Sequence, residues 1–158
     1  MEPEVSKMRI HATLVGALAI ASCVAAAPID TAVIVNSGST NSYGYTIHVS
    51  SDGKATVALQ ARGAAPGTPK AFTVPAATTA TFFSDLAAAR KGDATTVPCM
   101  KSASFGSSLH ISWQGWTSPD LTCPAKDSLG DALITDVGAI RKAAGIPESP
   151  PLRGAGGP

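Results

Sequence analysis

The sequence predicts an α+β domain, with an antiparallel sheet of two hairpins, one or two helices packed on one face of it, and one disulfide. Two segments in the first half of the chain alternate apolar and polar residues on either side of a short turn, which is typical of a hairpin. A segment near the end repeats apolar residues at helical spacing. Two cysteines follow an export signal, and in an oxidising compartment an isolated pair is most simply a disulfide.

Residues 1–26 are predicted to be an export signal peptide. A basic start is followed by the apolar run 12–21 and then by small residues, which is the pattern of such signals. Met8 is a second candidate initiator, because the two glutamates before it do not suit the start of a signal. The apolar run is well short of the ~20 residues that cross a bilayer as a helix, and no later stretch is longer. We therefore expect no transmembrane segment in the mature chain.

Two processing routes stay open for this signal. A signal peptidase can cut after Ala25 or Ala26, whereas cleavage directly before Pro28 is disfavoured because proline fixes φ and lacks an N–H. In the other route, residues 20–23 resemble a bacterial lipoprotein box in which Cys23 is lipidated. The first route yields a periplasmic or secreted protein, and the second a protein anchored to the membrane by lipid.

The rest of the chain is predicted to be a single α+β domain at 27–146, followed by a disordered tail at 147–158 that is rich in proline and glycine. Aromatic residues are few and small residues abundant, so we expect a core of small and β-branched side chains. The whole chain has a formal net charge of +1, and no segment is strongly basic. Nucleic acid is therefore not expected as a partner.

The first strand is expected at 31–35, and the first hairpin follows at 45–49 and 54–59. A two-residue turn at Asp52-Gly53 would mix the apolar and polar faces of this hairpin. A three-residue turn that starts at Ser51 instead keeps one face apolar, because a slip of one residue reverses every side chain. We therefore expect the longer turn, with Gly53 in the left-handed conformation.

A short strand is expected at 71–74 and a helix at 75–92. Thr78 or Thr79 is expected to cap this helix at its start, and basic residues suit its end. The consecutive aromatic residues Phe82-Phe83 leave a strand here as the alternative.

A second hairpin is expected from 100–105 and 109–113, and 115–124 is then a loop closed by the disulfide. The last helix is expected at 126–144, where apolar residues recur at helical spacing. Asp127 or Ser128 can cap this helix, and Gly145 ends it.

Cys99 and Cys123 are the pair predicted to form the disulfide. The loop of about 25 residues that they close would contribute roughly 3 kcal/mol to stability on the chain-entropy estimate. A metal site is not expected, because only His48 and His110 are available and neither has zinc-ligand spacing. No cofactor is predicted.

Two runs of this region, residues 99–106 and 118–124, carry a family resemblance. With the paired cysteines and the run Ser118-Pro119-Asp120-Leu121, they resemble small exported bacterial proteins of unknown function. The resemblance covers about a quarter of the chain and implies a recurring domain. It implies no activity, cofactor or partner.

Trp116 and Asp120 are the candidate binding residues, each with a structural alternative. Trp116 can stack on a sugar or anchor a protein contact, or it covers the disulfide or a helix. Asp120 lies in a loop braced by Cys123, and such a stiff loop loses little entropy on binding, as in protease inhibitors. Alternatively, Asp120 accepts hydrogen bonds from backbone amides in a turn that leads to Cys123.

The function that these observations favour is a non-enzymatic exported module that binds a protein or glycan at the cell envelope or outside it. A protease-inhibitor-like protein is a more specific form of that hypothesis. A small hydrolase that uses His48 or His110 with a serine is the alternative class, although no Gly-x-Ser-x-Gly motif or glutamate pair is present. A purely structural component of the envelope is the third class.

Overall fold

A computed structural model describes residues 28–61, 64–102 and 106–146 of this chain. They form an antiparallel sheet with two helices and one disulfide, which confirms the α+β class. The strands are β1 (Thr31–Asn36), β2 (Gly44–Ser50), β3 (Lys54–Gln60), β4 (Lys70–Thr73), β5 (Leu109–Trp113) and β6 (Trp116–Thr117), and the helices are α1 (Ala76–Gly92) and α2 (Ser128–Ala143). The predicted signal with Cys23 and the predicted tail at 147–158 lie outside the described residues.

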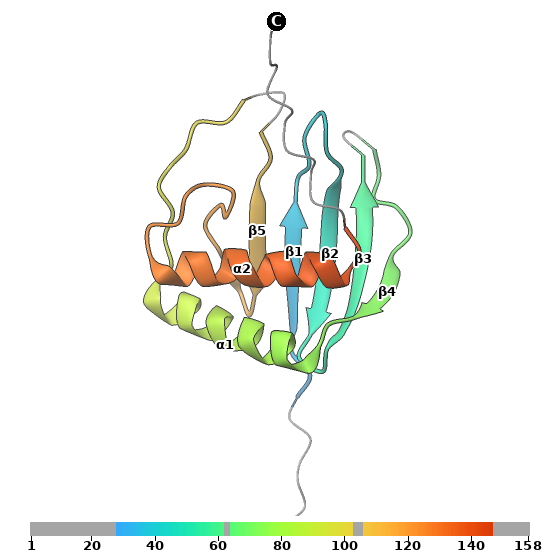
Figure 1. Ribbon diagram of the computed structural model, residues 1–158, viewed down its shortest axis with the longest axis horizontal. Coiled ribbons are helices and arrows are strands. Elements are labelled where there is room, and N and C mark those ends of the chain that lie inside the picture. Colours follow the sequence, from blue (N-terminus) through green and yellow to red (C-terminus); the bar gives the residue numbers. More distant parts are fainter. Residues whose placement is uncertain (1–27, 62–63, 103–105, 147–158) are drawn as a thin grey trace, which may run out of the picture.

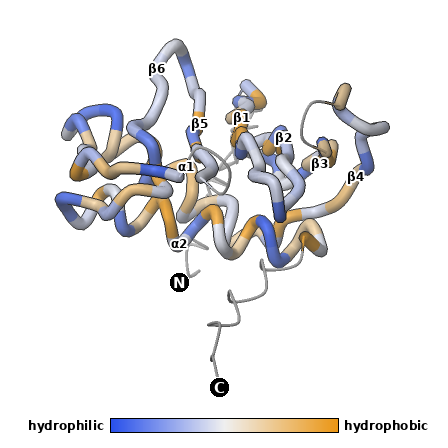
Figure 2. Tube along the Cα trace, turned by 90° about the horizontal axis from the view of Figure 1, so that it is seen from above, coloured by the Kyte–Doolittle hydropathy of each residue, from blue (hydrophilic) through white to orange (hydrophobic). Residues whose placement is uncertain are grey.

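The six strands lie in the order β4-β3-β2-β1-β5-β6, and each neighbouring pair is antiparallel. Helices α1 and α2 lie side by side on one face of the sheet, and both cross the strands (Figure 1). None of the helices in the described residues lies on the other face (Figure 2). Within the described residues, no helix has the length and apolar character needed to cross a membrane.

The register of the first hairpin is the predicted one. Ile47 lies opposite Val57 and Val49 opposite Ala55, so the apolar side chains share one face. Gly53 has a φ of 84°, the left-handed conformation that the three-residue turn requires. A Cβ atom at this position would lie 2.9 Å from the carbonyl oxygen of Val74, so the turn also needs glycine for space.

The prediction of a second hairpin from 100–105 and 109–113 is wrong. β5 lies between β1 and β6, so both of its edges are already occupied. Along the outer edge, the backbone amides of Ser118 and Leu121 donate to carbonyl oxygens of β5 at 2.9 Å each. Residues 103–105 of the expected strand lie outside the described residues.

The hairpin that does form here joins β5 to β6 through Gln114 and Gly115. Both turn residues have positive φ, 47° and 76°, which is the geometry of a tight two-residue hairpin turn. β6 has only two residues, too few for an alternating pattern, which is why the sequence predicts a loop for this segment.

Helix α1 confirms the predicted helix and excludes the strand alternative for Phe82-Phe83, but its predicted cap is wrong. The helix starts directly after Pro75, and no side chain caps it. Thr79 lies inside the first turns, where its buried hydroxyl donates to the carbonyl oxygen of Pro75 at 3.2 Å. Pro75 itself occupies the N-cap position, so Thr78 and Thr79 fall inside the helix and cannot cap it.

Helix α2 has the predicted cap and end. The Asp127 carboxylate accepts a hydrogen bond from the backbone N–H of Gly130 at 2.9 Å. Gly145, just beyond the helix, has a φ of 67°. Gly130 lies so close to Ala125 that a Cβ there would be 2.9 Å from the Ala125 Cβ, so this glycine allows the entering chain to pack against the helix.

The core lies between the helices and the covered face of the sheet. Ile111, Ile34, Ile47 and Val57 form one apolar row across four strands. The helices contribute buried side chains that pack on this face: Phe82, Leu86, Leu133, Val137 and Ile140. Small and β-branched residues therefore dominate the sheet side of the core, as expected.

Candidate functional site

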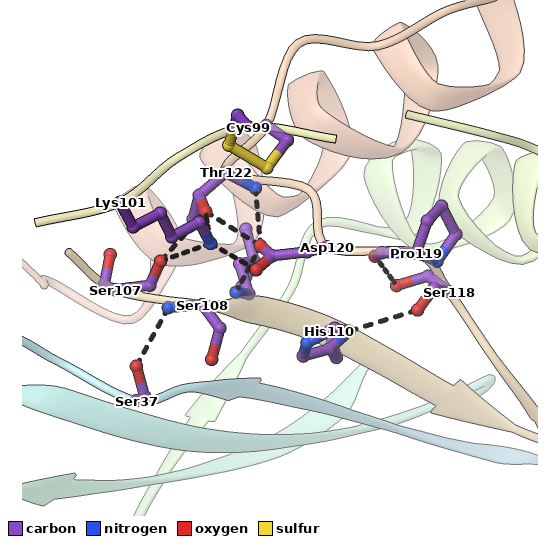
Figure 3. A network of polar contacts seen from close by, with 12 residues as sticks. Ser37, Cys99, Lys101, Ser107, Ser108, His110, Ser118, Pro119, Asp120 and Thr122 are labelled. Atoms are coloured by element: carbon purple, nitrogen blue, oxygen red, sulfur yellow. Dashed lines mark hydrogen bonds and ion pairs between the residues drawn. A yellow bond between two sulfur atoms is a disulfide. The ribbon is translucent and has the colours of Figure 1, made fainter. Parts of the chain in front are cut away.

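The predicted disulfide between Cys99 and Cys123 is present, with Cα atoms 5.5 Å apart. It joins residues 99–102, which precede β5, to residues 118–123, which precede α2. We call these two segments the bridged loops (Figure 3). The disulfide is compatible with an oxidising compartment outside the cytoplasm.

Asp120 lies at the centre of the bridged loops, and its carboxylate forms several hydrogen bonds and an ion pair within the protein. The carboxylate accepts hydrogen bonds from the backbone N–H of Leu109 at 3.1 Å and of Thr122 at 3.0 Å, and from the Thr122 hydroxyl at 2.8 Å. The ammonium group of Lys101 forms an ion pair with the same carboxylate. The contacts agree with the structural alternative for Asp120, in which it accepts hydrogen bonds from backbone amides in a turn.

Partial burial by itself would raise the pKa of the Asp120 carboxyl. The hydrogen bonds from Lys101, Thr122 and the Leu109 amide outweigh this effect and hold the pKa well below its usual range. Asp120 is therefore ionised at any physiological pH, and its charge is neutralised by a neighbour inside the same loops.

Lys101 was not identified from the sequence, yet it ties the first bridged loop to the second. Its ammonium group donates to the carbonyl oxygen of Ser107 at 2.6 Å, and also to Thr122 and Asp120 (Figure 3). About three quarters of its side chain is buried. The one signal that could have found it is a single cation next to Cys99 in a segment with few charges.

Met100, between Cys99 and Lys101, is the second residue that the sequence did not single out. Its relative accessibility is 104%, the highest among the exposed large apolar residues of the described chain. The residue before it is held by a covalent bond, and the residue after it by an ion pair and hydrogen bonds. An apolar side chain is thus displayed on a backbone that is fixed on both sides.

Ser118 and His110 lie next to the bridged loops, but they do not form a catalytic pair. The Ser118 hydroxyl accepts from the Ile111 N–H and donates to the carbonyl oxygen of Pro119, both at 2.9 Å. The Nδ1 atom of His110 is 3.1 Å from the carbonyl oxygen of Ser118, so this nitrogen donates and is not free to act as a base.

His48 lies elsewhere, on β2. It faces Val33 across the strand pair, while His110 faces Val35, so β1 separates the two histidines on the uncovered face of the sheet. An open hollow of about 470 Å³ lies beside His48, lined also by Ser50, Lys54 and Thr56. Within the described chain, the structure does not assemble the histidine, serine and aspartate set that a hydrolase of this kind would need.

Trp116 lies opposite Trp113 at the end of the β5–β6 hairpin, is half-buried and packs against the core. This arrangement agrees with the structural interpretation of Trp116. Trp113 carries more of the contacts: its ring is 6.2 Å from Phe83 and 5.9 Å from the guanidinium carbon of Arg90. Its indole N–H donates to Asp30 at 3.0 Å.

Comparison with known protein families, curated proteins and solved structures finds no match to this chain. The described residues hold no group of three or more side chains that could bind a metal ion. The resemblance to exported bacterial proteins therefore stays an expectation, and the binding roles of Trp116 and Asp120 stay predictions.

Proposed function

We propose that this chain is an exported binding module, not an enzyme, and that it contacts a protein of the cell envelope or its surroundings through Met100. The observation that carries this proposal is the complete exposure of Met100 between two anchored residues. A methionine side chain that reaches water on all sides gains free energy by entering an apolar pocket, about 1.5–3 kcal/mol for full burial.

The anchoring of the bridged loops supports a role in binding because it lowers the cost of association. A mobile loop loses conformational entropy when a partner fixes it, whereas a loop already fixed does not. Here the disulfide and the Lys101–Asp120 ion pair have fixed the backbone on both sides of Met100 before any partner arrives. Asp120 thus serves binding by holding the loop, and Trp116 by completing the core beneath the hairpin.

A site-specific cross-linking experiment tests this proposal. The full chain is produced in an exporting bacterial host, and its intact mass with and without reductant reports signal cleavage and the disulfide. A photoreactive amino acid then replaces Met100 in one variant and Tyr43 in a control, because Tyr43 is also exposed but lies on another loop, between β1 and β2. Cross-linked proteins are identified and purified.

The expected result is a partner that cross-links at position 100 and not at position 43. Its affinity for the purified module should fall roughly 10- to 100-fold in Met100→Asp, which corresponds to losing the burial of one methionine side chain. Tyr43→Asp should bind as well as the wild type. If positions 100 and 43 give the same cross-links, or if Met100→Asp binds normally, Met100 is not the contact and the proposal is wrong.

A further inference from the structure

We infer that the partner is an extracellular endopeptidase with an apolar specificity pocket, and that this chain is its substrate-like inhibitor. This inference rests on the proposed function and names the class of partner. Three features of the first bridged loop carry it: a backbone free to pair with an enzyme, one displayed side chain, and anchors on both sides of the peptide bond between Met100 and Lys101.

The backbone around Met100 is available for pairing. Residues 98–101 have no helix, strand or turn, and no described residue forms a hydrogen bond with the backbone of Met100. The last backbone contact before this segment is the hydrogen bond from the Val97 N–H to the Pro124 carbonyl oxygen, at 2.9 Å. A segment with free backbone groups can add to a partner as an extra strand, which is a common way to bind a peptide.

Pro98 is also exposed, but of the three residues 99–101 that the anchors hold, only Met100 has a side chain that can enter a specificity pocket. The side chain of Cys99 is consumed by the disulfide, and the side chain of Lys101 is turned inward to Asp120 and Ser107. Met100 is left as the residue whose carbonyl group a protease would attack. A long, unbranched apolar side chain suits a hydrophobic specificity pocket and not one that carries a carboxylate for lysine or arginine.

The anchors keep both ends of the cleavage site in place. If the enzyme hydrolyses the peptide bond, water adds its hydroxyl to the Met100 carbonyl carbon and a proton to the Lys101 nitrogen. The new carboxyl end stays linked to Cys123 through Cys99, and the new amino end stays bound to Asp120 and Thr122. Both ends are thus held by one short segment: the first by Cys123, and the second by Asp120 and Thr122.

Because the two ends stay together, the reverse reaction is intramolecular: the Lys101 nitrogen bonds to the Met100 carboxyl carbon again, and one water molecule leaves. Well-oriented intramolecular reactions have very high effective concentrations. A third contact supports the arrangement beyond Lys101: the Gly106 N–H donates to the Ser102 carbonyl oxygen at 2.8 Å. A Cβ on Gly106 would be only 2.7 Å from the Lys101 Cβ, so this approach requires glycine. The enzyme therefore remains occupied by an inhibitor that it releases slowly.

Inhibition assays with the oxidised, exported full chain test this inference. The panel consists of subtilisin and chymotrypsin, whose pockets accept large apolar side chains, and trypsin, whose pocket accepts lysine and arginine. We expect inhibition of at least one of the first two and none of trypsin. Met100→Lys should move inhibition to trypsin, and Met100→Asp should weaken inhibition of the apolar-specific enzyme roughly 10- to 100-fold. Tyr43→Lys is the control and should inhibit like the wild type.

Lys101→Met tests the role of the anchor. Its Met100 is unchanged, so the variant should still bind, but its cleaved ends are no longer both held, and inhibition should fade as the chain is consumed. Electrophoresis with and without reductant follows this cleavage, because only reduction separates fragments that the disulfide links.

The outcomes separate this inference from the proposed function. If neither apolar-specific enzyme is inhibited at micromolar concentration, or if Met100→Asp inhibits equally well, the protease inference is wrong. If cross-linking at position 100 then still yields a partner that is not a protease, the proposed function stands alone. If no partner depends on Met100, both are wrong.

Discussion

Two carboxylates of this protein have contrasting surroundings. One lies in the bridged loops and the other between the two helices, and comparing them shows how each region is stabilised. Asp120, in the bridged loops, has a cation and several donors around it, and these hold its pKa well below the usual range. For Asp136, on α2 where it faces α1, no cation of the described residues offsets the cost of burial. Burial, and next the negative charge of Asp85 on α1, raise the pKa of Asp136 to about 6.

The difference shows which region the protein builds to stay fixed. In the bridged loops, the Asp120 carboxylate is surrounded by the ammonium group of Lys101 and by hydrogen-bond donors of Leu109 and Thr122. Between the helices, apolar packing dominates, and the Oδ2 atom of Asp136 is buried without a hydrogen-bond partner among the described residues. The loops are therefore held by an ion pair, hydrogen bonds and a covalent bond, whereas in the helix pair the apolar packing outweighs the cost of burying the Asp136 carboxyl.

Of the changes that test this comparison, removing the disulfide should have the largest effect on the free energy of unfolding. The double variant Cys99→Ser and Cys123→Ser should lose about 3 kcal/mol of unfolding free energy, because the unfolded chain regains the entropy of a loop of roughly 25 residues. Chemical denaturation followed by circular dichroism measures this loss. Reduction of the wild-type protein should reproduce it. An unchanged midpoint would mean that the polar network alone fixes the bridged loops.

Asp136→Asn should have the next largest effect and the opposite sign at neutral pH. In the unfolded chain Asp136 ionises near pH 4, but in the folded protein it stays protonated up to about pH 6. The folded state thus binds more protons between these values, and the stability of the wild type falls as pH rises through this window. Screening by water limits the loss to about 2 kcal/mol. The asparagine variant should lack this fall and be more stable at pH 7.

Denaturation at a series of pH values from 3 to 8 checks this prediction. Asp85→Asn is the matched variant, because it removes only the neighbouring charge and should give part of the same gain. If Asp136→Asn shows the same decline between pH 4 and pH 6 as the wild type, another group is responsible.

Much of the fold could be predicted because its determinants are local. The turn at Gly53 and the alternation around it decide the register of the first hairpin within about fifteen residues. The Asp127 cap of α2 also depends only on neighbours in the chain. The partners of β5 could not be predicted in this way, because the choice between β1 and residues 100–105 depends on how the whole chain closes around the core.

In the candidate site, too, the local contacts could be predicted from the sequence and the contacts between distant segments could not. That Asp120 accepts from the amide two residues later is a local turn property, and the sequence indicated it as one of two interpretations. The ion pair with Lys101 joins residues on different loops, and nothing in the pattern of either segment points to the other. The exposure of Met100 follows from that pairing, because Lys101 turns inward and leaves its neighbour outside.

Asp120→Asn is expected to have the smallest effect, a loss of about 1–2 kcal/mol at pH 7, because asparagine keeps the shape but not the charge-assisted hydrogen bonds. The pKa of Asp120 is lowered in the folded state, so its contribution is present above pH 4 and is lost as pH falls further. Both this variant and Asp136→Asn should therefore resemble the wild type in strong acid, but at neutral pH Asp120→Asn should be less stable than the wild type and Asp136→Asn more stable.

Denaturation midpoints at pH 7 and at pH 2–3 measure this difference. Asp52→Asn is the control, since Asp52 pairs with Lys54 on an exposed turn and should leave the midpoint nearly unchanged. If Asp120→Asn is as stable as the wild type at pH 7, the ion pair adds nothing to the disulfide. The anchor on the Lys101 side of the Met100–Lys101 bond would then rest on the hydrogen bonds of Lys101 to Ser107 and Thr122, which Lys101→Met also removes.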